Sequence, residues 1–330
     1  MRLNTILKES QLTEQFRICG ETEFETLGLA SAEPDKSFCT FIDDIRFAET
    51  VSPAAAVILT DSELFPVLQE KFGEQKGYCI VDDPRLLFFQ LHNYLAGHGE
   101  YVRPRQETVV GNGCSISGLA YISENNVIIG NDVTIEEFAV IKENTVIGDH
   151  AVIRAGAVIG GQGFEFKRAG KGILAVEHLG GVRIKDFAEI QYNTCVDKAV
   201  YPWDDTVVGA YTKLDNLVHI GHGAKVGDRV MIVAQSGIGG RTVVGDDTWI
   251  GFGATVRNGI EIGEDARVNM GAVVTKPVLS GQSVTGNFAI EHKVFIEDMK
   301  TRVRTGGGGI DSALKYILMR TPCFVRGWLK

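Results

Sequence analysis

The sequence predicts a mainly β protein: a left-handed parallel β-helix of hexapeptide repeats, between a small N-terminal α/β domain and a C-terminal helical tail. Two observations lead to this prediction: an aliphatic residue recurs every six positions, and 39 of the 330 residues are glycine. A period of six fits neither an α-helix, with about 3.6 residues per turn, nor a long alternating strand. In a β-helix each hexad forms one wall and points its aliphatic residue into the core, while glycine suits the turns.

The six-residue register is kept over two long stretches. The longer one consists of Val208, Leu214, Ile220, Val226, Ile232, Ile238, Val244, Ile250, Val256, Ile262, Val268 and Val274, and the shorter one of Ile129, Ile135, Ile141, Ile147, Ile153 and Ile159. Ile184, Ile190 and Val196 are in phase with the longer stretch. If three hexads close one triangular coil, residues three hexads apart lie above one another, at a spacing of about 4.8 Å.

The register divides the chain into three parts. Residues 1–100 lack it, and two buried strands at 54–59 and 78–82 with a helix at 84–95 predict an α/β domain. The β-helix spans 109–278, and the tail spans 290–330, with a helix expected at 290–304.

The composition limits the classes of function. A net charge of −9 argues against general nucleic-acid binding, and no apolar run reaches the roughly 18 residues of a membrane span. The six cysteines show no CxxC spacing, which favours a reducing compartment, so we expect a cytoplasmic protein.

The C-terminal tail has the opposite charge to the rest of the chain. From Lys300 onward it contains seven basic residues and one acidic residue. Such a tail suits an anionic partner, either a protein or a peripheral membrane surface. It equally suits a helix that caps the open end of the β-helix.

Two segments interrupt the hexads. Residues 160–181 are rich in glycine and contain a basic stretch, and residues 199–206 are shorter and contain Pro202 and Trp203. A regular scaffold does not need such excursions, which can therefore be functional, although solvated loops are the alternative.

The candidate chemistry centres on His222, two residues after the inward position Ile220. At a coil corner its imidazole can reach the surface and act as a general base at neutral pH. Asp215 is close enough along the coil to orient the ring, and Gly240, three hexads further on, is expected to stack over it as a bare oxyanion donor. His219 is a supporting residue. Metal ligation by the two histidines is the weaker alternative, because neither a third histidine nor a cysteine recurs in neighbouring coils, so we expect no metal.

These features resemble a known family. The register, His219-Ile-Gly-His222 and Gly271-Ala-Val-Val-Thr-Lys-Pro-Val278 resemble the hexapeptide acyltransferases, and more closely the UDP-3-O-acylglucosamine N-acyltransferases of lipid A synthesis. The local matches, over about residues 1–290, are Gly28-Leu-Ala-Ser-Ala-Glu33, Phe41-Ile-Asp-Asp-Ile-Arg-Phe47, Val81-Asp-Asp-Pro-Arg85, Gly160-Gly-Gln-Gly-Phe164, Asp204-Asp-Thr-Val-Val-Gly209 and Asp215-Asn-Leu-Val-His219.

The resemblance implies a homotrimer whose active sites lie between neighbouring β-helices. It implies that His222 is the base, that Gly240 N–H holds the oxyanion, and that Phe41 and Phe47 clamp a uracil ring. Asp44 stands where the family usually has an asparagine that hydrogen-bonds uracil, and Phe47 replaces a tyrosine, so a different nucleotide remains an alternative.

Three functions are compatible with the sequence. The first is transfer of an acyl chain from acyl carrier protein to the amine of a UDP-linked amino sugar, with no cofactor beyond the donor's phosphopantetheine. Arg241, Arg257 and Asn258 would line the groove for that arm, and the basic tail or the two arginines could meet the acidic carrier. The second is acetyl-CoA-dependent N-acetylation of another nucleotide-linked amino sugar. The third is a non-catalytic scaffold.

Overall fold

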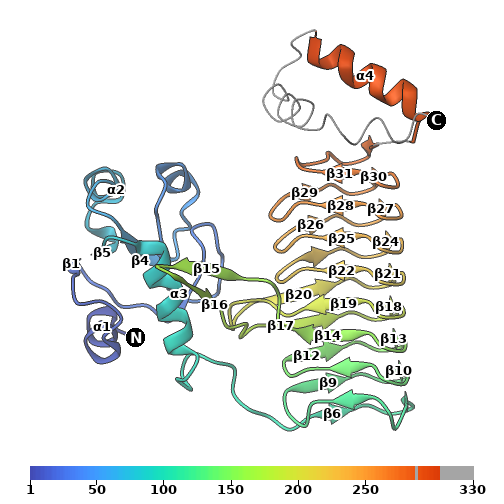
Figure 1. Ribbon diagram of the computed structural model, residues 1–330. Coiled ribbons are helices and arrows are strands. Elements are labelled where there is room, and N and C mark those ends of the chain that lie inside the picture. The colour runs from blue at the N-terminus through green and yellow to red at the C-terminus, as the bar shows by residue number, and fades with distance from the viewer. Residues whose placement is uncertain (287–288, 305–330) are drawn as a thin grey trace. The chain divides into compact units, whose positions relative to one another are not determined.

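The computed structural model describes residues 1–286 and 289–304. Residues 1–286 form one compact unit, which holds both the α/β domain and the β-helix, and the remainder of the chain forms a second unit. Figure 1 shows the elements in chain order.

The N-terminal domain is built on a five-stranded sheet in the order β1-β5-β4-β3-β2, in which only β1 is antiparallel to its neighbour. Asp83 begins the predicted helix at residues 84–95, because its carboxylate accepts a hydrogen bond from Leu86 N and Pro84 suits the first turn. The elements are α1 (Leu3–Ser10), β1 (Arg17–Cys19), β2 (Thr26–Leu27), β3 (Phe38–Phe41), the 3₁₀ helix η1 (Ile45–Thr50), β4 (Ala55–Thr60), α2 (Phe65–Phe72), η2 (Gly73–Gln75), β5 (Gly77–Ile80) and α3 (Pro84–Leu95).

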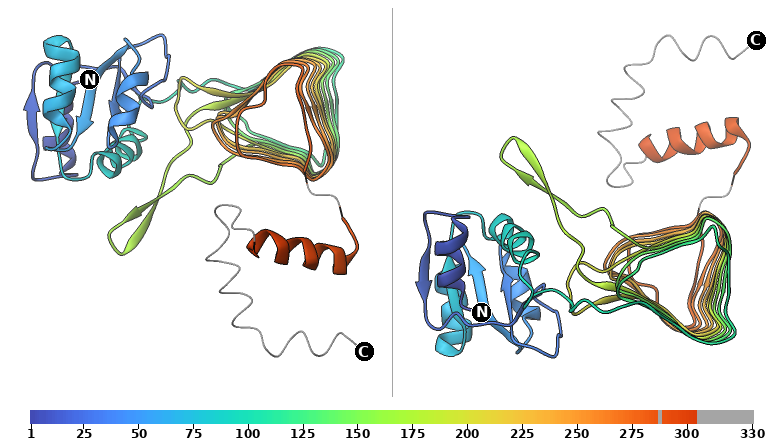
Figure 2. Two further views of the ribbon diagram at one scale, coloured as in Figure 1. Left: turned by 90° about the horizontal axis from the view of Figure 1, so that it is seen from above. Right: turned by 90° about the horizontal axis from the view of Figure 1, so that it is seen from below.

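The β-helix has three parallel sheets, which we call faces A, B and C, and the chain visits them in that order in every coil. Figure 2 shows the triangular section along the axis. Face A contains β6 (Val109–Val110), β9 (Val127–Ile129), β12 (Thr145–Ile147), β17 (Gly181–Ile184), β20 (Asp205–Val208), β23 (Lys225–Val226), β26 (Val243–Val244) and β29 (Glu261–Ile262). Face B contains β7 (Ser115–Ile116), β10 (Thr134–Ile135), β13 (Val152–Ile153), β18 (Glu189–Ile190), β21 (Lys213–Leu214), β24 (Met231–Ile232), β27 (Trp249–Ile250), β30 (Arg267–Val268) and β32 (Ser283–Val284). Face C contains β8 (Tyr121–Ile122), β11 (Val140–Ile141), β14 (Val158–Gly161), β19 (Cys195–Asp197), β22 (His219–Ile220), β25 (Gly237–Ile238), β28 (Thr255–Val256) and β31 (Val273–Val274).

The predicted register is the observed one. Ile220 pairs with Ile238, and Ile238 pairs with Val256, so each step from coil to coil spans three hexads. The inward aliphatic residues form one continuous buried core, in which each contributes about 1.5–3 kcal/mol by leaving water. The last strand, β32, lies beyond the predicted end at 278 because Val284 continues the inward column of face B above Val268.

Both excursions leave the β-helix at the corner between faces C and A, hereafter the C/A corner. In the first, β15 (Phe166–Ala169) and β16 (Gly172–Ala175) form an antiparallel hairpin. His92 of α3 contacts the return of this excursion, with Nε2 2.9 Å from the carbonyl oxygen of Glu177. The second excursion also reaches the N-terminal domain, because Trp203 Nε1 donates a 2.8 Å hydrogen bond to Leu27 O.

The tail begins as expected, with helix α4 at His292–Arg304. The glycine run at 306–309 and the basic segment after it lie outside the described residues. Within the described ranges, none of the helices is both long and apolar enough to cross a membrane.

Candidate active site

His222 lies at the C/A corner, directly after β22, and is only 8% exposed. Its Nε2 is 3.4 Å from Oε2 of Glu165, and the ring of His178 meets its ring edge-on at a centroid distance of 5.4 Å. Among the described residues, Nδ1 of His222 is buried without a hydrogen-bond partner. The turn therefore removes the imidazole from the aliphatic core but leaves it covered by the first excursion.

Gly240 lies where the three-hexad spacing predicts. Arg241 N donates a 2.9 Å hydrogen bond to His222 O, so the two corners are stacked in adjacent coils. A Cβ added at Gly240 would lie 2.9 Å from both Cε1 and Nε2 of His222, which is too close for a real side chain. The imidazole thus rests against bare backbone. Within the described chain, Gly240 N–H donates no hydrogen bond.

Glu165 is a site residue that the sequence reasoning missed. It is 7% exposed, and its Oε2 accepts a 3.0 Å hydrogen bond from Arg241 Nη2, while Lys167 binds Oε1. Lys167 Nζ also lies 4.2 Å from the ring centroid of Phe89 in α3, so the hairpin connects this corner with the N-terminal domain. The sequence leaves the excursion as either a functional segment or a solvated loop, and a single carboxylate within it carries no sequence signal.

Gly163 explains how the excursion can pass so close to the histidines. A Cβ at this position would lie 2.9 Å from Cδ2 of His222 and 3.0 Å from Nε2 of His178. Only a residue without a side chain lets the backbone cross both rings. His178 itself donates through Nδ1 to Val176 O at 3.0 Å, since a carbonyl can only accept.

The expectation that Asp215 orients His222 is wrong in this structure. Asp215 follows β21, at the corner between faces B and C rather than at the C/A corner. Its Oδ1 accepts from Asn216 N at 2.7 Å, and its Oδ2 accepts from Ala234 N at 3.0 Å. The carboxylate satisfies turn amides of two coils, and Glu165 instead supplies the carboxylate beside the imidazole.

His219 is the outward-facing residue of β22. Its Nε2 lies 2.9 Å from Oδ2 of Asp197, which is buried on the neighbouring strand β19. The hydrogen bond to Asp197 raises the pKa of His219.

The two histidines of the motif have opposite electrostatic surroundings. Burial and then the positive charge of Arg241 lower the pKa of His222 to about 4, although Glu165 acts in the other direction. Burial alone would raise the pKa of Glu165, but Arg241 and Lys167 outweigh it and the pKa is lowered. At neutral pH the site therefore contains an uncharged imidazole beside an ionised carboxylate.

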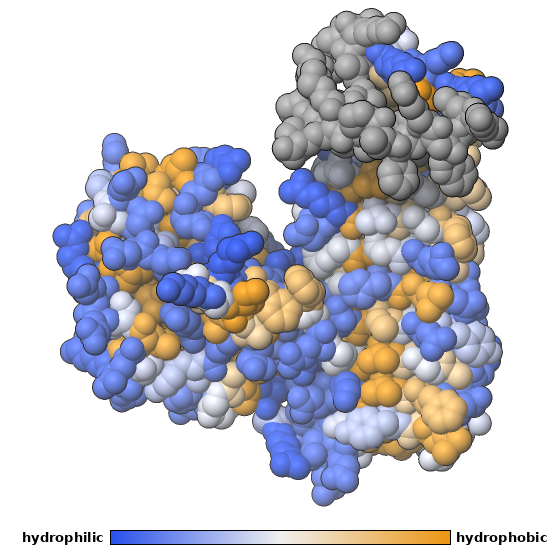
Figure 3. Space-filling view, viewed as in Figure 1, coloured by the Kyte–Doolittle hydropathy of each residue, from blue (hydrophilic) through white to orange (hydrophobic). Residues whose placement is uncertain are grey.

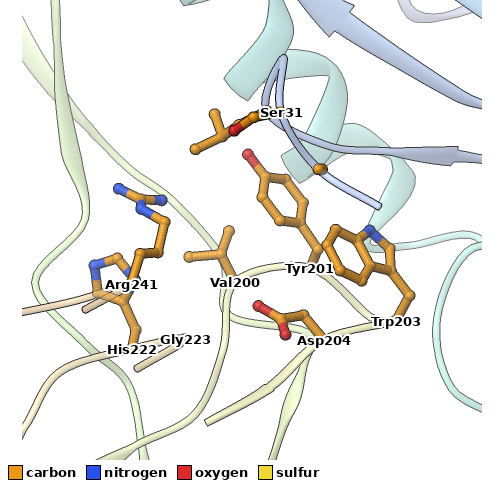
Figure 4. Close-up of a pocket in the computed structure, with 10 residues that line it drawn as sticks. Ser31, Val200, Tyr201, Trp203, Asp204, His222, Gly223 and Arg241 are labelled. Atoms are coloured by element: carbon orange, nitrogen blue, oxygen red, sulfur yellow. The ribbon is translucent and has the colours of Figure 1, made fainter. Parts of the chain in front are cut away.

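A pocket adjoins His222 between the second excursion and the loop after β2 (Figure 4). Tyr201 points toward Ser31, while His222 and Arg241 lie on the other side of Val200. In the described part of the chain the buried Tyr201 hydroxyl has no hydrogen-bond partner. The pocket is lined by Leu29, Ser31, Ala32, Val200, Tyr201, Trp203, Asp204, His222, Gly223 and Arg241.

The residues expected to bind a nucleotide lie close together in sequence, with Phe41 at the end of β3 and Asp44 and Phe47 at η1. Phe41 packs against Phe88 at a ring distance of 5.0 Å, and Phe47 is 46% exposed on η1. Asp44 caps η1 and binds the Arg46 side chain, whose hydrogen bonds lower the pKa of Asp44 to about 2. Asp44 is therefore an ionised acceptor already paired within its own turn.

The expected groove residues also lie at the C/A corner. Arg241 follows β25, while Arg257 and Asn258 follow β28, one coil further along. Arg241 donates a hydrogen bond to the Glu165 carboxylate, whereas Arg257 donates a 3.5 Å hydrogen bond to Thr275 O. Among the described residues, no group of three or more histidine, cysteine, aspartate or glutamate side chains is arranged to hold a metal ion.

Comparison with known proteins agrees with this architecture. The family model "Bacterial transferase hexapeptide (six repeats)" matches residues 126–161, 205–240 and 241–276. The UDP-3-O-acylglucosamine N-acyltransferase of Helicobacter pylori strain J99 is 31% identical over 281 residues, covering 76% of this chain and 78% of that protein. The enzyme of the same name from Caulobacter sp. strain K31 is 35% identical over 162 residues, which is 49% of this chain but only 47% of that relative.

A further relative, UDP-3-O-acylglucosamine N-acyltransferase 2 of Legionella pneumophila strain Lens, is 45% identical over 100 residues, covering 30% of this chain and 29% of that protein. Among solved structures, a UDP-N-acetylglucosamine acyltransferase from Bacteroides fragilis aligns with a TM-score of 0.48 and 20% identity over 68% of this chain and 90% of that chain. Given the repeat match and the Helicobacter alignment along most of its length, the chain belongs to the UDP-3-O-acylglucosamine N-acyltransferase family.

Proposed function

We propose that this protein transfers an acyl chain from an acyl carrier protein thioester to the amine of a UDP-linked 3-O-acylglucosamine, in lipid A biosynthesis. The observation that carries the proposal is the neutral imidazole of His222 against the bare backbone of Gly240, at one corner of a β-helix. The names of the family's members support the choice of substrate.

In the proposed reaction the amine nitrogen attacks the thioester carbonyl and gives up a proton to His222. Because the imidazole is uncharged at neutral pH, it is ready to accept that proton. The Gly240 N–H, which has no partner among the described residues, is the donor for the oxyanion. Glu165 stabilises the resulting imidazolium through its charge, the role that aspartate has in a catalytic triad.

Substrate binding follows from the surrounding residues. The N-terminal domain holds the nucleotide, with Phe41 and Phe47 flanking the base. The donor's phosphopantetheine arm lies along the C/A corner past Arg257 and Asn258, so the enzyme needs no cofactor of its own. The acidic carrier is attracted by basic residues such as Arg257.

The active form is a homotrimer located in the cytoplasm. An exposed apolar ridge along the corner between faces B and C supports self-association, because monomers rarely expose such patches. Figure 3 shows apolar residues recurring between hydrophilic ones on the side of the β-helix that carries face C. The ridge consists of Leu119, Phe138, Tyr192, Leu217, Phe252 and Met270.

The test is a product analysis. The protein is incubated with UDP-linked 3-O-acylglucosamine and a panel of acyl carrier protein thioesters, with acetyl-CoA as a parallel donor, and products are identified by mass spectrometry. An N-acylated product from a carrier thioester is expected. N-acetylation of another nucleotide-linked amino sugar from acetyl-CoA would replace the proposed substrates, and binding of UDP-sugars without turnover from any donor would indicate a scaffold.

A further inference from the structure

His219 has the surroundings of a proton donor. Its side chain is 55% exposed, while the Asp197 carboxylate that holds it is 12% exposed. Since a carboxylate can only accept, Nε2 of His219 carries the proton in the 2.9 Å hydrogen bond. Nδ1 is then the nitrogen that gains or loses a proton, and it makes no hydrogen bond to any described residue.

The two strands beside β22 differ in what they place next to the His219 imidazole. β19 places a charged group there, and β25 leaves the space empty. On β19, Cys195 pairs with His219, and Asp197 is the charged group that faces it. On β25, the partner is Gly237, where an added Cβ would meet no atom within 4 Å. The position beside His219 on β25 therefore carries no side chain, and the space next to it is free.

His222 differs from His219 in each of these respects. Its ring is covered by the first excursion, and its pKa is lowered, whereas that of His219 is raised. The titratable and charged groups that act on His222 are Arg241 from the next coil, Glu165 and His178 from the excursion, and Asp197 from the preceding coil. Two groups whose surroundings separate their proton affinities are suited to opposite roles in one reaction.

We propose that His219, positioned by Asp197, donates the proton that the leaving sulfur needs, while His222 takes the proton of the amine. This inference rests on the proposed acyl transfer from a thioester. The amine nitrogen forms the C–N bond and loses one proton to His222. The C–S bond breaks, and the thiolate takes the Nδ1 proton of His219, which keeps Nε2–H on Asp197.

The products are an amide and a free thiol, and the two histidines exchange one proton through solvent to return to the starting state. A thiol of the pantetheine type has a pKa near that of free cysteine, about 8.5, so at neutral pH its departure is assisted by a donor.

The experiment compares two donors with the same acyl chain. One is an alkyl thioester that releases a pantetheine-type thiol, and the other is an aryl thioester whose thiophenol leaves without assistance. We expect His219→Gln to lower kcat by about 10²-fold with the alkyl donor and by less than about tenfold with the aryl donor. His222→Gln is expected to lower both equally. His150→Gln, at an exposed corner histidine outside the site, is the matched control and retains both activities.

A second readout does not depend on turnover. Asp197 raises the pKa of His219, so Asp197→Asn is expected to lower it, which NMR titration of labelled histidine measures directly. Because the acid must be protonated, the alkaline limb of kcat/KM moves to lower pH in the same variant.

Equal losses with the two donors in His219→Gln would overturn the inference, as would a His219 that titrates no higher than His222. If the wild-type protein transfers from neither thioester, the proposed function itself fails, and the titration alone then reports whether the Asp197–His219 pair behaves as described.

Discussion

A Cβ built on Gly240 would stand 2.9 Å from Nε2 of His222, so the imidazole and the backbone of the next coil are in direct contact. This contact follows from the stacking of corners in adjacent coils, since Arg241 N donates to His222 O. His222 and the Gly240 amide, the proposed base and oxyanion donor, are therefore positioned by the same ladder of backbone hydrogen bonds.

Gly240→Ala is expected to displace the His222 ring. Added bulk at a packed position costs about 1–3 kcal/mol of stability, but a misplaced base costs more in rate, about 10²-fold in kcat. Chemical denaturation and steady-state kinetics measure the two effects separately. Gly118→Ala is the control, because an added Cβ meets no atom within 4 Å there, and it should change neither quantity. Wild-type turnover in Gly240→Ala would separate this backbone from the reaction.

Glu165→Gln tests which carboxylate supports the base. Glu165 raises the pKa of His222 against the effects of burial and Arg241, so the glutamine variant has a weaker base. We expect the acidic limb of kcat/KM to move to lower pH and kcat to fall about tenfold, which corresponds to about 1.4 kcal/mol of transition-state stabilisation. An unchanged pH profile would show that the 3.4 Å contact has no role in proton transfer.

Asp215→Asn is the counterpart of Glu165→Gln, because it neutralises the carboxylate at the corner between faces B and C. Asparagine has one acceptor oxygen in place of two, so one of the amides of Asn216 and Ala234 loses its partner. The expected cost is about 1–3 kcal/mol of unfolding free energy, with kcat retained. Urea unfolding and kinetics at one pH check this. A large loss of kcat in a variant of normal stability would return Asp215 to the reaction.

The contact between α3 and the first excursion is expected to weaken in acid. His92 is fully buried, Nδ1 lies 2.8 Å from the Tyr101 hydroxyl, and burial lowers the pKa of His92 to about 4. The unfolded chain then binds a proton near pH 6.5, whereas the folded chain does so only near pH 4. The stability contributed by the neutral ring is thus complete above about pH 6.5 and is lost as the pH falls toward 4.

Urea unfolding at pH 7.5 and pH 5 measures this effect. The wild-type protein should lose about 2 kcal/mol more than His92→Gln over this interval, because about 1.5 pH units lie inside the window. Equal losses in the two proteins would show that another group is responsible for the acid sensitivity.

The β-helix and the Gly240 contact could be predicted because both follow from one period. Each inward residue, such as Ile220, is repeated in the next hexad and again in the next coil, so the register is determined by many residues at once. The position of Asp215 does not follow from the period, because a residue close to His222 along the chain can still lie one corner away from it.

Glu165 could not be predicted because its place depends on tertiary contacts. The first excursion is held by contacts with α3: Lys167 lies over the Phe89 ring, and His92 contacts the Glu177 carbonyl. Neither contact follows from the six-residue period of the sequence. The role of Asp197 could not be predicted from the sequence either. Its pairing with His219 becomes visible only when β19 and β22 are aligned, and the second excursion makes the step between these strands longer than a regular coil.

The strands of successive coils still pair across the two excursions, so the lengths of these excursions can change as such a protein diverges. Ile159 pairs with Val196 and Val196 with Ile220, and although both steps are longer than three hexads, the inward column continues unbroken. Surplus residues leave and re-enter at one edge, where the pairing of β14 with β19 shifts register between Ile159 and Gly161, while the inward residues keep their pairing. Loops at that edge can therefore lengthen, shorten or be exchanged between homologues while the inward column of the β-helix continues.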